Sequence, residues 1–410
     1  MKLWILNHYA ITPDMPGGTR HFDLSRELVK RGYQVAVFAS SFHHYQHQDM
    51  KLRPDENWKV EHVEGVQFVW LRTFPYRRND WRRVLNMISY MLRAWWLGYR
   101  VLKPVPEIGK PDVVIGSSVH LLAVLAAYGV AQHHQAKFIM EVRDLWPQTI
   151  IDMGVLNNGH PLARILRILE QFLYKRSERI ITLLPLAGNY ISAQSIDGKK
   201  IVWIPNGVDL AKFSDVRTQE KANGQFKVMY LGAHGPVNAL DVLLNAAKIV
   251  QGRGYQAIRF ILVGDGPEKP RLVELAKELG LRNTEFRDPV LKSKVPQALR
   301  EADATVLLMN DLPLYRYGIS PNKAFDYLAA RKPLVLSGNP VNNLVEDARC
   351  GLIVPPRDPQ ALAEAVIRLY EMAPEERQAM GQQGREYVKK YHDWAILANK
   401  LQECIEEVCL

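Results

Sequence analysis

Short apolar runs rich in β-branched residues alternate with amphipathic helical patterns along the whole chain of 410 residues. This alternation is typical of βαβ units, in which helices join parallel strands and cover the sheet. A chain of this length exceeds one ordinary hydrophobic core, because domains contain about 100–200 residues. We therefore expect an α/β protein with two parallel sheets, each in its own domain.

The predicted strands fall into two series. The first series comprises 2–6, 34–39, 66–71, 113–116, 138–142, 179–182 and 201–204. The second comprises 227–231, 260–263, 284–287, 304–308 and a strand that begins after Pro333. An Asn206-Gly207 turn and a polar stretch at 214–223 lie between the two series, as expected of an interdomain linker. We predict a first domain at 1–205, a second at 206–390 and a C-terminal helix at 391–410.

The composition limits the cellular location and the kind of partner that this protein can have. The three cysteines, Cys350, Cys404 and Cys409, show neither a disulfide framework nor metal-ligand spacing, which favours a reducing, cytoplasmic location. No apolar run is long enough to span a bilayer. The net charge of +10 predicts an acidic partner, and nucleic acid, a phosphate-bearing substrate and an anionic membrane all fit it.

The segment at 72–103 departs from the α/β rhythm. It has basic residues throughout and one acid, Asp80, and its aromatic residues are Phe74, Tyr76, Trp81, Tyr90, Trp95, Trp96 and Tyr99. This pattern favours peripheral association with the inner face of a membrane, where rings lie among headgroups and arginines meet phosphates. A helix packed on the sheet with a solvated basic face is the alternative. Nucleic acid is not an expected partner, because no helix-turn-helix, RNP-type or zinc-finger pattern accompanies the segment.

The stretch from Gly318 to Pro333 is predicted to contain a loop, a helix and the start of a strand. Pro321 would begin the helix after an N-cap at Ser320, so Lys323 and Asp326 would lie in its first turns. Unpaired backbone N–H groups there attract anions. Lys323 would bind the phosphates of a nucleotide and Asp326 its ribose hydroxyls. A solvated Lys–Asp pair at (i, i+3) is the alternative.

Other motifs lie where a parallel sheet binds ligands, at the carboxyl ends of its strands. In the first half these are the Gly17-Gly18 turn before a helix at 21–31, His120 before a helix at 121–131, and the pair Arg143 and Asp144. Arg143 and Asp144 would either face a substrate or pair as a salt bridge. In the second half, two glycine-containing turns each precede a helix. The first holds His234, Gly235 and Asn238, and the second holds Gly264, Gly266 and Arg271. The next strand leads into a third loop, which contains Val290.

Together these motifs resemble the retaining, two-domain glycosyltransferases of GT-B architecture, and in particular the N-acetyl-L-fucosamine transferases of bacterial O-antigen and capsule synthesis. The resemblance covers nearly the whole chain, and its most specific part is Ser320-Pro-Asn322-Lys323 with Asp326. It implies two facing Rossmann-like domains with a donor cleft between them. Many relatives carry a glutamate eight residues before the ribose-binding acid, where this chain has Gly318.

The resemblance also implies roles for single residues. His120 would line the donor sugar, while Arg271 and Lys323 would contact the diphosphate, and we treat these three as the candidate catalytic residues. Arg143 and Asp144 would contact the acceptor. His234 and Asn238, which replace an arginine and a lysine of relatives, would contact the donor. The other residues expected to contact the donor are Ser320, Asn322, Asp326, Val290 and the glycines at 17, 18, 235, 264 and 266.

The expected reaction transfers a sugar from a UDP-sugar, such as UDP-N-acetylfucosamine, to a polyprenyl-diphosphate-linked saccharide, with retention. No carboxylate pair with glycosidase spacing is recognisable, so no protein nucleophile is assigned. No Asp-x-Asp motif accompanies the diphosphate site, and we expect neither a metal nor a cofactor. Two alternatives are a UDP-sugar 2-epimerase of the same architecture and a non-catalytic nucleotide-sugar-binding protein.

Overall fold

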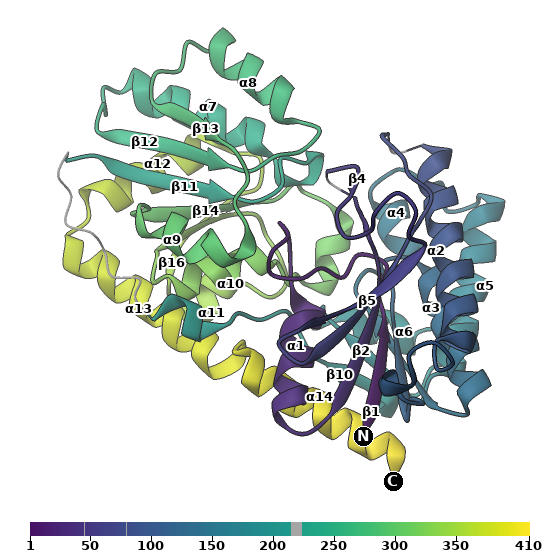
Figure 1. Cartoon of the computed structure of the whole chain (residues 1–410). Coiled ribbons are helices and arrows are strands. Elements are labelled where there is room, and N and C mark those ends of the chain that lie inside the picture. Colours follow the sequence, from purple (N-terminus) through teal and green to yellow (C-terminus); the bar gives the residue numbers. More distant parts are fainter. Residues whose placement is uncertain (45, 79, 215–223) are drawn as a thin grey trace.

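Two parallel sheets organise the chain in the computed structural model, which describes residues 1–44, 46–78, 80–214 and 224–410. Each sheet is covered by helices on both faces, and the two α/β domains lie side by side (Figure 1). The expected two-domain Rossmann-like architecture is therefore confirmed. Apart from Ser214, the predicted linker at 214–223 lies outside the described residues.

The first sheet has eight strands in the order β10-β9-β8-β7-β1-β2-β6-β5. Their bounds are β1 Lys2–Leu6, β2 Gln34–Ser40, β5 Trp58–Val63, β6 Val66–Leu71, β7 Val113–Ser117, β8 Lys137–Val142, β9 Arg179–Thr182 and β10 Ile201–Trp203. All neighbours are parallel except β5 and β6. A small separate hairpin joins β3 (Phe42–His43) to β4 (Gln48–Asp49). The sheet reverses its direction of winding between β1 and β7, which marks a ligand-binding crevice.

Two helical layers cover the first sheet. One face is packed by α1 (Arg20–Lys30) and by α14 (Trp394–Cys409), which comes from the far end of the sequence. The other face carries α2 (Trp81–Arg100), α3 (Leu121–His134) and α5 (Pro161–Arg176), with α3 in contact with both of the others. Shorter helices α4 (Gln148–Asp152) and α6 (Ala187–Ser192) complete this half.

The second sheet has the order β13-β12-β11-β14-β15-β16, a doubly wound arrangement with its switch between β11 and β14. Its strands are β11 Phe226–Leu231, β12 Ile258–Val263, β13 Thr284–Arg287, β14 Ala304–Leu308, β15 Leu334–Ser337 and β16 Gly351–Val354. One face packs on α7 (Leu240–Gly252), α8 (Lys269–Glu278) and α12 (Pro359–Glu371). The other packs on α9 (Val295–Arg300), α10 (Asn322–Ala329), α11 (Leu344–Ala348) and α13 (Pro374–Tyr391).

Two chain crossings join the domains and lie against each other. The backbone N–H of Val208 donates to the carbonyl of His392 at 2.8 Å, and Trp394 returns a bond to Val208. A Cβ atom at Gly207 would lie 2.5 Å from the carbonyl oxygen of His392, so only glycine fits there. This pairing explains how α13 can lie on the second domain while α14 packs on the first.

Within the described ranges, no helix is long and apolar enough to cross a membrane. Most of the basic aromatic segment at 72–103 forms α2, and its Trp81, Trp95 and Trp96 are exposed. Two of its predicted surface rings, Tyr76 and Tyr90, are buried. Tyr90 faces inward because its hydroxyl donates to the carbonyl of Phe38 at 2.8 Å.

Candidate active site between the domains

A cavity of about 330 Å³ lies between the carboxyl edges of the two sheets. Its lining includes Arg143 and Asp144 from the first domain and Asn238, Asn322 and Lys323 from the second. The structure thus brings the predicted acceptor residues opposite part of the predicted donor set. Apolar side chains complete the wall, including Leu145, Leu183, Leu184, Met309, Leu314, Tyr315 and Tyr317.

Lys323 is held at this cavity by two neutral groups. Its Nζ donates to the hydroxyl of Tyr230 and to Oδ1 of Asn238, each at 2.7 Å, and it stands 4.5 Å from the centre of the Tyr230 ring. Burial lowers the pKa of Lys323 to about 7. Among the described residues, no carboxylate forms an ion pair with this amine within 4 Å, so its charge is available to an anion.

The start of α10 differs from the prediction by one residue. Pro321 is the N-cap and the helix begins at Asn322, so the expected cap at Ser320 is wrong. The Ser320 hydroxyl instead accepts from the backbone N–H of Asn206 at 2.8 Å, and its carbonyl accepts from Nδ2 of Asn206 at 2.6 Å. Ser320 lies on the cavity wall and ties the donor helix to the domain junction.

Asp326 is buried just outside the main cavity. Both of its carboxylate oxygens accept from Nζ of Lys292, at 2.7 and 2.6 Å. Burial raises the pKa of Asp326, and Lys292 opposes this shift. A second, small cavity is lined by Asp326, Lys292 and Asn322 together with Thr19 and Asp23 of the first domain. Lys292 was missed from the sequence, because a lysine in the loop that follows Val290 gave no sign of its contact with Asp326.

The two glycine-containing turns of the second domain pack against each other. A Cβ at Gly264 would lie 1.9 Å from the carbonyl oxygen of Gly232, and one at Gly266 would lie 2.5 Å from that of His234. The His234 ring is buried, and neither ring nitrogen has a hydrogen-bond partner within the described chain. Burial lowers its pKa to about 4. Gly235 follows this residue and precedes the short 3-10 turn Pro236–Asn238.

Several predicted donor residues stand apart from the main cavity. Arg271 is 57% exposed and pairs with Glu268 at 2.6 Å. Val290 packs beside the core under α10. Gly17 and Gly18 lie in the loop after β1, and a Cβ at Gly18 would come within 2.6 Å of Nδ2 of Asn322. The glycine loop therefore touches the donor helix, but Arg271 does not line the cavity described here.

His120 is also absent from the cavity wall. It caps α3, because its Nδ1 accepts from the backbone N–H of Ala123 at 3.1 Å. Its Nε2 lies 2.7 Å from Nδ1 of His8, and burial lowers its pKa to about 3. The sugar contact expected of His120 remains a prediction.

Arg143 and Asp144 both line the cavity, and within the described residues no ion pair under 4 Å joins them. The expected alternative of a salt bridge on the rim is therefore not found. Burial raises the pKa of Asp144, and the charge of Arg143 opposes the shift. Ser118 positions this loop, because its hydroxyl accepts from the backbone N–H of Arg143 at 3.1 Å.

A buried polar network behind the cavity was not predicted. The carboxylate of Glu141 binds Nε of Arg20 and Nε2 of His21, each at 2.7 Å. The same guanidinium donates to the carbonyls of Ile204 at 2.9 Å and Pro205 at 2.5 Å. Arg20 thus connects the end of β8 to the point where the chain leaves the first domain.

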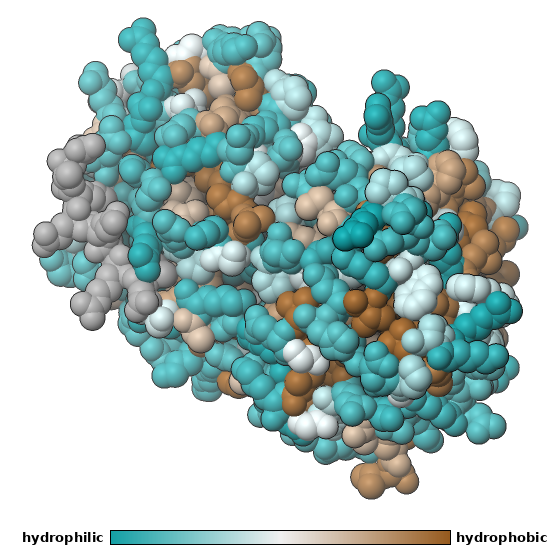
Figure 2. All heavy atoms as spheres, in the orientation of Figure 1, coloured by the Kyte–Doolittle hydropathy of each residue, from teal (hydrophilic) through white to brown (hydrophobic). Residues whose placement is uncertain are grey.

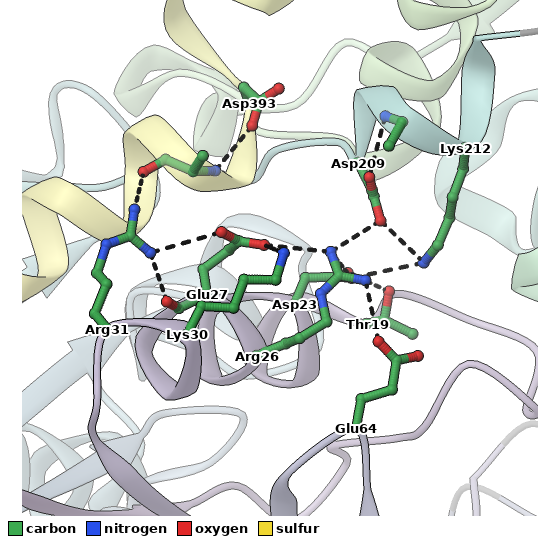
Figure 3. A network of polar contacts seen from close by, with 12 residues as sticks. Thr19, Asp23, Arg26, Glu27, Lys30, Arg31, Glu64, Asp209, Lys212 and Asp393 are labelled. Atoms are coloured by element: carbon green, nitrogen blue, oxygen red, sulfur yellow. Dashed lines mark hydrogen bonds and ion pairs between the residues drawn. The ribbon is translucent and has the colours of Figure 1, made fainter.

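A second network, nearer the surface, connects α1 to both chain crossings (Figure 3). Arg26 donates to Asp209 at 2.8 Å, and Lys212 lies 3.4 Å from the same carboxylate. On the other side, Arg31 donates to the carbonyl of Ala395 at 2.9 Å. These contacts fix α1 to the chain segment at Asp209 and Lys212 and to α14.

Two family models match the chain, one in each domain. Residues 17–207 match the glycosyl transferase 4-like domain, and residues 225–372 match glycosyl transferases group 1. The chain belongs to the group 1 glycosyltransferases. Similar curated proteins of this kind include the probable glycosyltransferase WbjE of Pseudomonas aeruginosa, which is 22% identical over 81% of this chain and 83% of its own length. The putative colanic acid biosynthesis glycosyl transferase WcaI of Escherichia coli is 21% identical over 72% and 74%.

Solved structures with the same fold include sucrose-phosphate synthase from Thermosynechococcus elongatus. It is 17% identical, has a TM-score of 0.75, and the match covers 99% of this chain and 98% of that one. Anabaena HepE in complex with UDP and glucose is 14% identical with a TM-score of 0.69, covering 99% of both chains. These likenesses confirm the GT-B fold of this glycosyltransferase.

Proposed function

We propose that this glycosyltransferase moves a sugar from a UDP-sugar to a polyprenyl-diphosphate-linked saccharide, with retention, in the synthesis of a bacterial surface polysaccharide. An N-acetylated amino sugar such as N-acetylfucosamine is the proposed cargo. The colanic acid role named for WcaI and the UDP bound to HepE support the pathway and the donor. A two-domain cavity with polar groups on both walls suits a reaction between two substrates.

The observation that carries the proposal is Lys323. An amine with a phenol and an amide as neighbours, at the first turn of a helix and on a cavity wall, suits the diphosphate of a nucleotide sugar. As the bond from the anomeric carbon to the diphosphate breaks, negative charge grows on the departing oxygen. Lys323 would stabilise that charge by electrostatic attraction.

Retention follows if the acceptor approaches on the face that the diphosphate leaves. The acceptor hydroxyl oxygen forms the new bond to the anomeric carbon, and its proton passes to the departing diphosphate oxygen. No protein nucleophile is needed in this scheme. Lys323 and the α10 terminus supply the positive charge, so the proposed reaction does not depend on a metal.

The outer helices of the first domain support a lipid-linked acceptor and peripheral attachment to the inner membrane face. Hydrophobic residues gather where α2 and α5 lie (Figure 2). On α2, Trp81, Trp95 and Trp96 are exposed, and arginines stand over two of the rings. On α5, an exposed stripe at helical spacing consists of Leu162, Ile165, Ile168 and Phe172. The sequence interpretation missed this second stripe.

Radiolabelled UDP-N-acetylfucosamine, UDP-N-acetylglucosamine and UDP-N-acetylgalactosamine, offered with phenoxyundecyl-diphosphate-linked mono- and disaccharides, would test the proposal. We expect label to move into the lipid fraction, with the anomeric configuration of the donor kept in the product. Conversion of the UDP-sugar into its C2 epimer, without transfer to the acceptor, would identify the epimerase instead. UDP binding without any transfer in the wild-type protein would favour a nucleotide-sugar-binding protein.

A further inference from the structure

Four stacked rings form a column at the carboxyl edge of the first sheet. Tyr90 of α2 stacks on His8 with ring centres 4.3 Å apart, and His8 stacks on Tyr9 at 4.4 Å. Tyr9 in turn stacks on His44 at 4.6 Å. The column begins in the core at Tyr90 and reaches the partly exposed rings of Tyr9 and His44.

Hydrogen bonds behind the column determine which nitrogen of His8 carries a proton. Nδ1 of His120 accepts from the Ala123 N–H, so the proton of the His120 ring lies on Nε2. That Nε2–H donates to Nδ1 of His8 at 2.7 Å. Burial lowers the pKa of both rings, which keeps them neutral. The proton of His8 therefore lies on its own Nε2.

That Nε2–H is a donor without an acceptor in the described chain, although His8 is fully buried. The hydroxyl of the neighbouring Tyr9 is also buried and also lacks a partner among the described residues. Buried polar groups are nearly always hydrogen-bonded. Two such groups on consecutive residues are therefore available to a ligand that supplies oxygen atoms.

The position of the pair agrees with this interpretation. His8 and Tyr9 follow β1 at the switch point between β1 and β7, where open α/β sheets bind ligands. The same loop continues to Gly18, which touches Asn322 of the donor helix. His44 stands at the outer end of the column. Burial is the main cause of the lowered pKa of His44, and the positive charge of Arg143 also contributes. The column therefore ends near Arg143, which lines the cavity.

We propose that His8 and Tyr9 bind the saccharide of the acceptor. The Nε2–H of His8 donates to one sugar oxygen, and the Tyr9 hydroxyl bonds to another. Tyr9 is the partly exposed ring of the pair, so the acceptor approaches from the Tyr9 side of the column. In this inference His120 acts as a positioning residue in place of the predicted donor-sugar contact, because both of its ring nitrogens are used and its Nε2–H holds the His8 ring in the donating tautomer. The inference rests on the proposed function, in which the acceptor is a saccharide.

Tyr9→Phe removes one hydroxyl and keeps the stacked ring. We expect the acceptor KM to rise about two- to tenfold, as for loss of one hydrogen bond, with unchanged UDP affinity. Thermal stability should stay the same or rise, because a buried orphan is removed. His8→Phe, which also keeps a ring, should raise the acceptor KM in the same way.

Tyr90→Phe is the matched control, since its hydroxyl is already bonded to Phe38. It should lower the melting temperature and leave the acceptor KM unchanged. The assay uses the phenoxyundecyl-diphosphate acceptor that the wild-type protein glycosylates, and calorimetry follows binding of the same compound without turnover. A wild-type acceptor affinity in Tyr9→Phe would overturn the inference, as would a parallel loss of UDP affinity. Absence of transfer by the wild-type protein would instead overturn the proposed function, while calorimetry would still decide between the variants.

Discussion

Lys323 is an amine that the fold leaves without a carboxylate partner in the described chain, and burial brings its pKa to about 7. Lys323 therefore titrates near neutral pH, whereas an exposed lysine does not. The arriving diphosphate would favour the charged amine and raise its pKa again. Binding of the diphosphate and protonation of the Lys323 amine are then linked.

The sign of this linkage gives the first prediction. Above pH 7 the free protein has lost the Lys323 proton, so binding of UDP-N-acetylglucosamine should take up as much as one proton at pH 8 and none at pH 6. Affinity should fall as pH rises above 7. Calorimetry in buffers of different ionisation enthalpy measures the uptake directly. Lys323→Met should abolish it, and an uptake that persists in this variant would assign the proton to another group.

Asp326 yields a second prediction at the same scale. Asp326→Ala should weaken UDP binding by about 1.5–3 kcal/mol, because a charged acceptor for the ribose hydroxyls is lost. Pyrophosphate has no ribose and serves as the control ligand, with unchanged affinity expected. Equal losses for both ligands in titration calorimetry would show that Asp326 acts through Lys292 or the fold and not through ribose.

The sequence alone predicted the positions of some residues around the cavity and not of others. Lys323 and Asn238 both line the predicted interdomain cavity, because a βα turn and a helix start fix their positions. The role of Ser320 could not be predicted, because its hydroxyl is used by Asn206, which is distant in sequence. Gly318 shows why the glutamate of relatives is excluded here: φ is +97° and a Cβ would lie 2.5 Å from Cδ of Pro185.

At the scale of elements, α5 presents the stripe that the sequence interpretation missed. Ile165 and Ile168 are 61% and 69% exposed, and Arg164 and Arg167 lie beside them. Replacing both isoleucines by serine should weaken binding to anionic phospholipid vesicles about tenfold or more, since each buried side chain contributes about 1.5–3 kcal/mol. Folding stability should change little.

Val341→Ser with Ile353→Ser is the control pair, because both side chains are exposed and lie in the second domain. Vesicle sedimentation at low and high salt measures the effect, and the remaining binding should weaken with salt. Equal retention of both double variants on vesicles would remove α5 from the membrane surface.

The strands β1, β6, β9, β13 and β14 have the predicted bounds, and all of them except β13 contain adjacent apolar residues. The antiparallel strand β5 was not predicted, because it lies at the sheet edge and carries Lys59, Glu61 and His62 among its apolar residues. The hairpin strands β3 and β4 have two residues each, too few for any period to show. Strands at a sheet edge and very short strands lack the apolar pattern from which a strand is predicted.

At the scale of the whole molecule, Arg20 joins the first sheet to the departing chain. Arg20→Met should reduce the free energy of unfolding by about 3–5 kcal/mol, because Glu141 would remain buried without its main partner. Arg271→Met removes an exposed pair and should cost about 0–1 kcal/mol. Urea denaturation compares the two variants. Similar losses in both would show that the buried pair contributes no more than a surface pair.

The helix α14 has a consequence for how this protein is made. Its residues Trp394, Leu397, Leu401 and Ile405 belong to the same core as Phe22 and Leu28 of α1. A ribosome has therefore produced the entire second domain before the first domain can close its hydrophobic layer. The first domain must wait, with one face of its helical layer incomplete, until residues 394–409 emerge. The last core contacts of the earliest synthesised half therefore form only after the whole of the second domain has been synthesised.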